Sequence, residues 1–300
     1  MPRNAPSRLP RLEQWRAAGR SFSFNGNDIF YRDSGGPAGR DVLLLLHGFP
    51  TASFDWHALW DALATRFRVV TADMLGFGFS AKPPNGTYSI AIQADLFEEL
   101  TEHLAIGEVH LLAHDYGDTV AQELLARALE SRTKLRIRSA CLLNGGLFPE
   151  AHRALLIQKL LASSLGPLVA RLTNAGSFRR SFARIFGPDT QPTDNELNEY
   201  RALVTERSGQ LLFPKLIGYI AERRRQRERW VGALQKSAVP LRLINGLVDP
   251  ISGRHMVERY RELIPHPDIV ELERIGHYPQ VEAPARVLQA VMEFHDRLPK

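Results

Sequence analysis

The chain has 300 residues, of which 44% are hydrophobic and 24% charged, and its formal net charge is +5. This length suits one large α/β unit, or a core with a smaller domain inserted into it. The excess of basic residues is small and no nucleic-acid-recognition motif is evident, which argues against a nucleic-acid-binding protein. We expect the arginine-rich run 222–229 to be a solvated helix face. No segment approaches the roughly 20 apolar residues of a membrane span.

The amino-terminal stretch is basic but has no apolar core typical of a secretory signal, so we expect a cytoplasmic protein. The single cysteine, Cys141, allows no internal disulfide and lies in an apolar run. We expect its thiol to be buried as a small hydrophobic group.

Short apolar runs alternate with helix-length segments along most of the chain. An antiparallel hairpin is predicted from residues 21–25 and 28–32, which flank Gly26-Asn27. Strand-like runs follow at 42–46, 67–72, 109–113, 137–143, 241–245 and 269–272, and helical patterns at 54–64, 90–104, 116–129, 255–264 and 283–298. Continuous apolar runs are typical of strands buried on both faces of a parallel sheet. The alternation predicts an α/β fold.

The alternation stops after the sixth of these strands. Residues 147–235 have helical patterns punctuated by Pro167, Gly187-Pro188 and Pro192. We interpret them as a helical lid inserted over the sheet. The predicted core then consists of residues 1–146 and 236–300.

The strongest chemical signal lies around Asp115. A buried strand ends at Ala113, a helical pattern begins within a few residues, and Gly117 follows two positions after Asp115. A small residue on each side suits the sharp strand-to-helix turn that carries a nucleophile, here with aspartate in place of serine. The alternative is an ordinary helix N-cap, a common role for aspartate.

Two further residues favour the nucleophile. Asp249 follows the strand-like run 241–245, and His277 follows the run 269–272, so both are expected at the carboxyl edge of the sheet. The order nucleophile, acid, histidine is that of a hydrolase triad. Backbone N–H groups of Phe49 and Tyr116 are then the expected oxyanion donors.

These motifs carry a family resemblance. His47-Gly48-Phe49-Pro50, residues 73–80, His114-Asp115-Tyr116-Gly117, Asp249 and Gly276-His277 are similar to the epoxide hydrolase and haloalkane dehalogenase branch of the α/β-hydrolases. From about Trp15 onward the chain resembles more closely the mesoderm-specific-transcript type of hydrolase. The resemblance implies a mostly parallel, twisted sheet of about eight strands with helices on both faces and an inserted lid.

An aspartate nucleophile restricts the reaction. A carboxylate with a reference pKa near ~3.9 is ionised at neutral pH and suits attack on a saturated carbon that bears a leaving group. The product is an alkyl ester, which water activated by His277 and Asp249 would hydrolyse. The substrate is expected to be a small apolar epoxide or halide, with no cofactor and no metal; the oligomeric state is not predicted.

The two reactions differ in the side chains that assist departure of the leaving group. The resemblance implies an indole or amide halide donor in dehalogenases, whereas Tyr116 and Phe49 stand at those positions. For epoxide hydrolases the resemblance implies two lid tyrosines that protonate the departing alkoxide, and Tyr219 matches the second of them in chain order. The first has no clear counterpart, although His152 or Tyr200 could replace it. His47 and His114 complete the residues predicted near the pocket.

We therefore favour an epoxide hydrolase that forms vicinal diols. The alternative within the same chemistry is a dehalogenase of haloalkanes or halo-acids. The alternative of another class is a weakly active or inactive protein that binds partners or membranes through residues 150–165 and the arginine-rich run.

Overall fold

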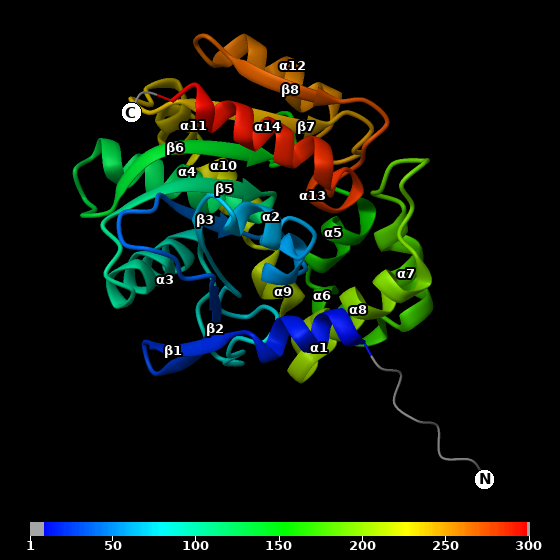
Figure 1. Cartoon of the computed structure of the whole chain (residues 1–300). Helices are drawn as coiled ribbons and strands as arrows, with labels where there is room; N and C mark the ends of the chain where they lie inside the picture. Colours follow the sequence, from blue (N-terminus) through cyan, green and yellow to red (C-terminus); the bar gives the residue numbers. More distant parts are fainter. Residues whose placement is uncertain (1–8, 299–300) are drawn as a thin grey trace.

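An eight-stranded sheet forms the centre of the molecule. The computed structural model describes residues 9–298 (Figure 1). The strand order is β1-β2-β4-β3-β5-β6-β7-β8; β1 and β2 are antiparallel to their neighbours, and the other pairs are parallel. The bounds are β1 Arg20–Phe24, β2 Asn27–Asp33, β3 Val42–Leu46, β4 Arg68–Ala72, β5 Glu108–His114, β6 Arg136–Leu143, β7 Leu241–Gly246 and β8 Asp268–Leu272. The predicted mostly parallel α/β sheet is confirmed.

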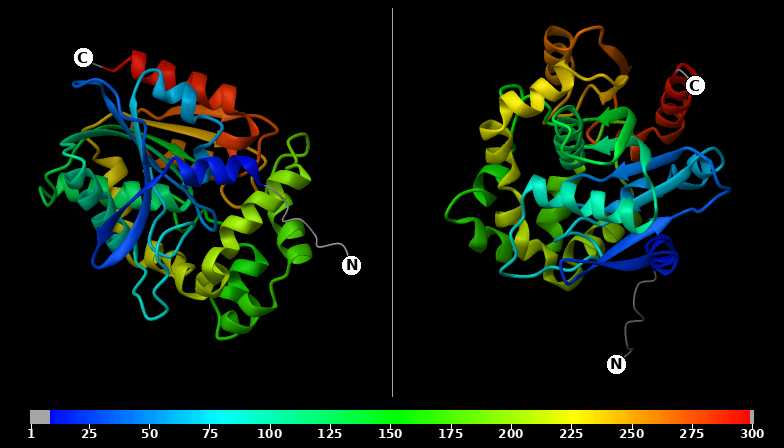
Figure 2. Two further views of the ribbon diagram at one scale, coloured as in Figure 1. Left: turned by 60° about the horizontal axis from the view of Figure 1, so that its bottom comes forward. Right: turned by 90° about the vertical axis from the view of Figure 1, so that its left-hand side faces the viewer.

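The middle strands are apolar because helices cover both of their faces. Leu43 to Leu46 of β3 have no exposed surface and pair with β4 on one side and β5 on the other. The helices α3 (Ile90–His103), α4 (Tyr116–Leu129) and α11 (Arg227–Gln235) pack together on one face. On the other face lie α2 (Trp60–Ala64) and α14 (Pro284–Asp296), as the right-hand view of Figure 2 shows. Cys141 of β6 is fully buried, as expected.

Between β6 and β7 the described chain is helical. Figure 1 shows α5 to α8 gathered at one end of the sheet. The bounds are α5 Leu156–Leu161, α6 Gly166–Leu172, α7 Ala175–Ala183, α8 Asp194–Thr205, the 3₁₀ helix η2 Glu206–Leu212, α9 Phe213–Leu216 and α10 Tyr219–Arg225, followed by α11. After β7 come α12 (Arg254–Leu263) and α13 (Pro279–Glu282).

Three local features differ from the predicted pattern. The hairpin turn is Asn25-Gly26, one residue earlier than expected, and both residues have the positive φ that a type I′ turn requires. The helix predicted over 54–64 is split into η1 (Ser53–Trp56) and α2. Helix α1 (Pro10–Ala17) was not predicted, because only two of its side chains are buried.

Candidate active site

Asp115 occupies the turn between β5 and α4. Its backbone has φ 49° and ψ −102°, a conformation that costs a non-glycine residue about 1–3 kcal/mol. Gly117 explains the tightness of the turn, because a Cβ there would lie 2.3 Å from the carbonyl oxygen of Leu46. The Asp115 carboxylate makes no capping hydrogen bond to α4. The N-cap interpretation therefore does not account for this side chain.

Asp115, His277 and Asp249 lie together at the carboxyl ends of three strands. The Nε2 atom of His277 is 4.0 Å from Oδ2 of Asp115, and its Nδ1 atom is 2.8 Å from Oδ2 of Asp249. The side chains of Asn144 and Ser252 also donate hydrogen bonds to this Asp249 oxygen, at 2.9 and 2.8 Å. The three residues are at most 3% exposed. This is the geometry of an acid that orients a histidine toward a nucleophile.

Charge pairing governs the ionisation of this group. Burial alone would raise the pKa of Asp249, but His277 and the Asn144 amide hold it at about 2. Burial alone would lower the pKa of His277, but the charge and hydrogen bond of Asp249, together with the charge of Asp115, raise it to about 9. The two neighbouring carboxylates thus favour the protonated imidazolium of His277.

Phe49 and Tyr116 are the two predicted oxyanion donors, and a contact with the carboxylate is present for Phe49. The backbone N–H of Phe49 donates a hydrogen bond of 3.1 Å to Oδ2 of Asp115. Tyr116 is the first residue of α4, and its side chain is fully buried. A donor that already contacts the carboxylate oxygen is placed to contact the same oxygen when charge develops on it.

Tyr219 lies close to the site at the start of α10. Its ring is 4.8 Å from that of Tyr116 and 6.1 Å from that of Phe49. The side chain is 1% exposed, and its hydroxyl has no hydrogen-bond partner among the described residues. Burial and the charge of Asp115 raise its pKa, so the hydroxyl keeps its proton.

Arg223 is a site residue that the sequence analysis missed. We expected a solvated position, but its side chain is only 2% exposed. Its Nη2 atom donates to the backbone carbonyl of Asp115 at 2.9 Å and lies 3.8 Å from Oδ1, and Nε donates to the Thr119 hydroxyl. Nη1 has no partner among residues 9–298. A buried cation thus lies near Oδ1 of Asp115, whereas Phe49 donates to Oδ2.

The two histidines predicted near the pocket connect loops. The Nε2 atom of His47 accepts a hydrogen bond from the backbone N–H of Met74, and burial lowers the His47 pKa to about 4. The Nε2 atom of His114 is 2.7 Å from the backbone carbonyl of His277. Burial and the neighbouring His277 lower the pKa of His114 to about 3. Both are placed to hold the catalytic loops rather than to contact a substrate.

His152 and Tyr200 have different surroundings. Both ring nitrogens of His152 are buried without partners in the described chain, and burial together with Arg223 lowers its pKa to about 3. Tyr200 of α8 is fully buried against Phe182 and Tyr278, with ring centroids at 5.0 and 6.1 Å.

A cavity of about 220 Å³ reaches the site from the helical segment. Its lining includes Phe49 and His277 but not His47, His114, His152, Tyr200 or Tyr219. Its wall is mostly apolar and comes largely from α5, α7 and neighbouring turns: Leu155, Ile157, Leu161, Phe178, Phe182, Ile185 and Phe213. Such a wall suits an apolar ligand.

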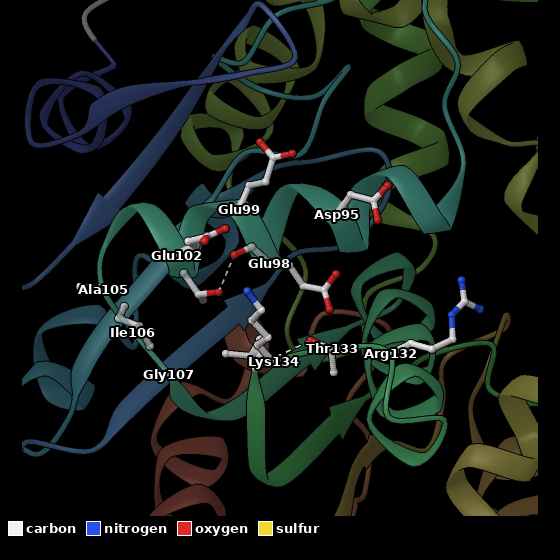
Figure 3. Close-up of a pocket in the computed structure, with 12 residues that line it drawn as sticks. Asp95, Glu98, Glu99, Glu102, Ala105, Ile106, Gly107, Arg132, Thr133 and Lys134 are labelled. Atoms are coloured by element: carbon white, nitrogen blue, oxygen red, sulfur yellow. Dashed lines mark hydrogen bonds between the residues drawn. The ribbon is translucent and has the colours of Figure 1, made fainter.

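A second hollow, of about 540 Å³, lies elsewhere (Figure 3). It runs between α3, with Asp95 and Glu98, and the turn that contains Arg132 and Lys134. It contains none of the residues described above. We assign it no part in the chemistry.

Two features are absent from residues 9–298. No group of three or more His, Cys, Asp or Glu side chains there is arranged to hold a metal ion. None of the described helices is both long and apolar enough to cross a membrane.

The comparisons with known proteins agree with this architecture. A family described as having the alpha/beta hydrolase fold matches residues 41–284. The chain belongs to the α/β-hydrolase family. It is 45% identical to the mouse mesoderm-specific transcript protein over 96% of this chain and 89% of that protein. LipZ of Mycobacterium tuberculosis is 40% identical, over 95% of this chain and 98% of LipZ.

More distant α/β-hydrolases include dehalogenases. Haloalkane dehalogenase 2 of Mycobacterium bovis is 30% identical, with 96% of each chain covered. The solved structure of the epoxide hydrolase CorEH matches with a TM-score of 0.75 at 20% identity, over 94% of this chain and 99% of that one. That likeness shows the fold alone. The family resemblance expected from the sequence is confirmed.

Proposed function

We propose that this α/β-hydrolase is an epoxide hydrolase whose nucleophile is Asp115. The observation that carries the proposal is the carboxylate itself: it occupies the strained turn, caps no helix, and faces both His277 and the Phe49 N–H. A carboxylate in that place favours displacement at a saturated carbon, because an anhydride formed from an ester or amide would revert.

The two carboxylate oxygens have different surroundings. Oδ2 accepts the Phe49 hydrogen bond, so it becomes the carbonyl oxygen of the ester. Oδ1, on the Arg223 side, then attacks the epoxide carbon. The carbon–oxygen bond of the ring breaks, and the departing alkoxide takes the proton of the Tyr219 hydroxyl. The product is a hydroxyalkyl ester of Asp115 and a Tyr219 phenolate.

Formation of this ester makes His277 a better base for the second step, which is hydrolysis of the ester. Esterification removes the Asp115 charge, which is one of the influences that raise the His277 pKa. That pKa therefore falls, and the imidazolium can pass its proton to the Tyr219 phenolate through solvent. Neutral His277 then takes a proton from water, and the hydroxide attacks the ester carbonyl. The Phe49 and Tyr116 N–H groups stabilise the oxyanion. Its collapse breaks the bond to the alkoxide, which takes the proton of the newly formed carboxyl group and leaves as the diol, so Asp115 is again a carboxylate and His277 an imidazolium.

We also propose that residues 147–235 form a lid over a core made of residues 1–146 and 236–300. The support is that the cavity wall comes largely from α5 and α7, while the triad belongs to loops after β5, β7 and β8. The lid would exclude bulk water while the ester forms.

The test is to trap the ester. A His277→Gln variant, incubated with a panel of aliphatic and aryl epoxides, is expected to gain the mass of the epoxide on the peptide that contains Asp115. An Asp115→Asn variant is the control and should gain nothing. If no epoxide leaves an adduct on folded His277→Gln, the proposal fails.

Dehalogenation is the second candidate, and one observation favours it. Arg223 Nη1 lacks a partner beside Asp115 and could receive a halide, as the 30% identity to haloalkane dehalogenase 2 also suggests. The same His277→Gln variant, exposed to haloalkanes and halo-acids, would then accumulate an adduct with release of halide. Equal wild-type and Asp115→Asn behaviour in every assay would instead favour a protein that only binds partners.

A further inference from the structure

The outer surface of α5 and α6 carries exposed leucines. Leu156 is 73% exposed, Leu165 56%, Leu168 55% and Leu172 67%. The last three have the spacing of one helix face, and α5, which begins with Leu156, contacts α6. We call these four residues the apolar stripe. Leucines gathered in this way mark an interaction surface, whereas single exposed leucines are ordinary.

The same stretch of chain is basic and has no acidic residue. Residues 151–188 contain no Asp or Glu. Five exposed basic side chains in this stretch have no carboxylate partner in the described chain, and we call them the basic rim: Arg153, Lys159, Arg171, Arg180 and Arg184. In the arginine-rich run, Arg227 is paired with Glu150 and Arg229 with Glu130, whereas Arg224 and Arg225 are exposed and lie on α10, outside the stretch that carries the apolar stripe. The basic rim therefore belongs to the same stretch of helices as the apolar stripe, and no carboxylate within residues 151–188 offsets its charge.

The inner sides of these helices line the cavity that leads to His277. Ile157 and Leu161 of α5 and Phe178 and Phe182 of α7 contribute to its wall. Leu156, next to Ile157, faces outward. One layer of helices thus separates the apolar stripe from the apolar cavity.

We propose that the apolar stripe and the basic rim dock this protein on an anionic lipid surface, from which the cavity takes an apolar substrate. The leucines would enter the acyl-chain boundary while the rim contacts headgroup phosphates, which is how amphipathic helices bind in the interface plane. Charge complementarity selects an anionic surface rather than a second copy of this basic chain. The proposal concerns delivery of substrate and does not depend on which bond Asp115 attacks.

Vesicle flotation tests the proposal. The full chain is expected to float with vesicles of equimolar phosphatidylcholine and phosphatidylglycerol, and to stay unbound with phosphatidylcholine alone. Leu168→Ser with Leu172→Ser should lower the partition coefficient by roughly tenfold for each leucine. Lys159→Gln with Arg171→Gln should lower it by about fivefold for each charge. All four side chains are exposed, so thermal unfolding should not change.

Matched controls use exposed residues elsewhere. Leu129→Ser on α4 removes a leucine that is 44% exposed, and Arg224→Gln with Arg225→Gln on α10 removes the same charge as the rim variant. These variants should float like the wild type. Absence of flotation with anionic vesicles, or equal losses in the controls, would overturn the proposal. So would a stripe variant that binds vesicles normally but turns a dimer into a monomer in light scattering.

Discussion

Replacing Asp249 by asparagine should slow hydrolysis of the Asp115 ester far more than formation of that ester. Asp249 Oδ2 lies 2.8 Å from Nδ1 of His277, and both groups are buried. At an effective dielectric constant near ~20, two unit charges at this separation attract by about 6 kcal/mol before burial costs are subtracted. Loss of that charge leaves burial opposed mainly by the charge of Asp115, so the pKa of His277 should fall from about 9 to near its ordinary 6.5 or below it.

A fall of that size removes at least about 3 kcal/mol of stabilisation from the imidazolium. The asparagine also no longer enforces the tautomer that presents a basic Nε2. The same change in a serine-protease triad lowers the rate about 10⁴-fold. We expect a comparable loss in hydrolysis of the ester, whereas alkylation of Asp115 should slow by less than about tenfold, because a carboxylate nucleophile needs no general base.

Rapid chemical quench with mass spectrometry measures both steps. Asp249→Asn should form the ester in a burst and then accumulate it. Asp189→Asn, which removes a surface carboxylate paired with Arg274, is the matched control and should turn over normally. Hydrolysis of the ester at the wild-type rate in Asp249→Asn would refute the role given to the pair.

The remaining predictions address single contacts. Tyr219→Phe should slow epoxide opening by roughly 10²-fold or more, as expected for loss of a general acid, and leave ester hydrolysis in single-turnover experiments unchanged; equal slowing of both steps would contradict this. Because the folded pKa of His277 is raised, its contribution to stability is complete below pH 6.5 and is lost as pH rises through about 9. Denaturant titrations should therefore show the wild type losing about 3 kcal/mol relative to His277→Gln across this window; parallel pH profiles would refute it. Gly117→Ala should destabilise the protein by several kcal/mol, because its Cβ would meet backbone 2.3 Å away; a thermal midpoint like that of the wild type would contradict the tight turn.

The sheet and the triad were predictable because their causes are local in sequence. The strands β3 to β7 are covered on both faces, so their sequences consist largely of consecutive apolar residues. Parallel strands bring their carboxyl ends to one edge, so residues that follow three such runs meet in space. Asp115, Asp249 and His277 are placed in this way.

There is a physical reason why the role of Arg223 could not be predicted from the sequence. The run 222–229 consists only of arginine, glutamate and glutamine, and nothing in that pattern shows which side chain faces the core. Only the packing of α10 beside α4 brings one arginine to the backbone of Asp115. Asn144 was missed in a similar way: its hydrogen bond to Asp249 joins residues from two different strand ends.

The most direct test of the central claim is a single turnover in water labelled with oxygen-18. If Asp115 forms an ester that water attacks at the carbonyl, the label must enter the Asp115 carboxylate and the first diol must be unlabelled. Digestion and mass spectrometry should then find the heavy oxygen in the peptide that contains Asp115. Label in the first diol and none in Asp115 would show that water attacks the epoxide directly, which contradicts the account.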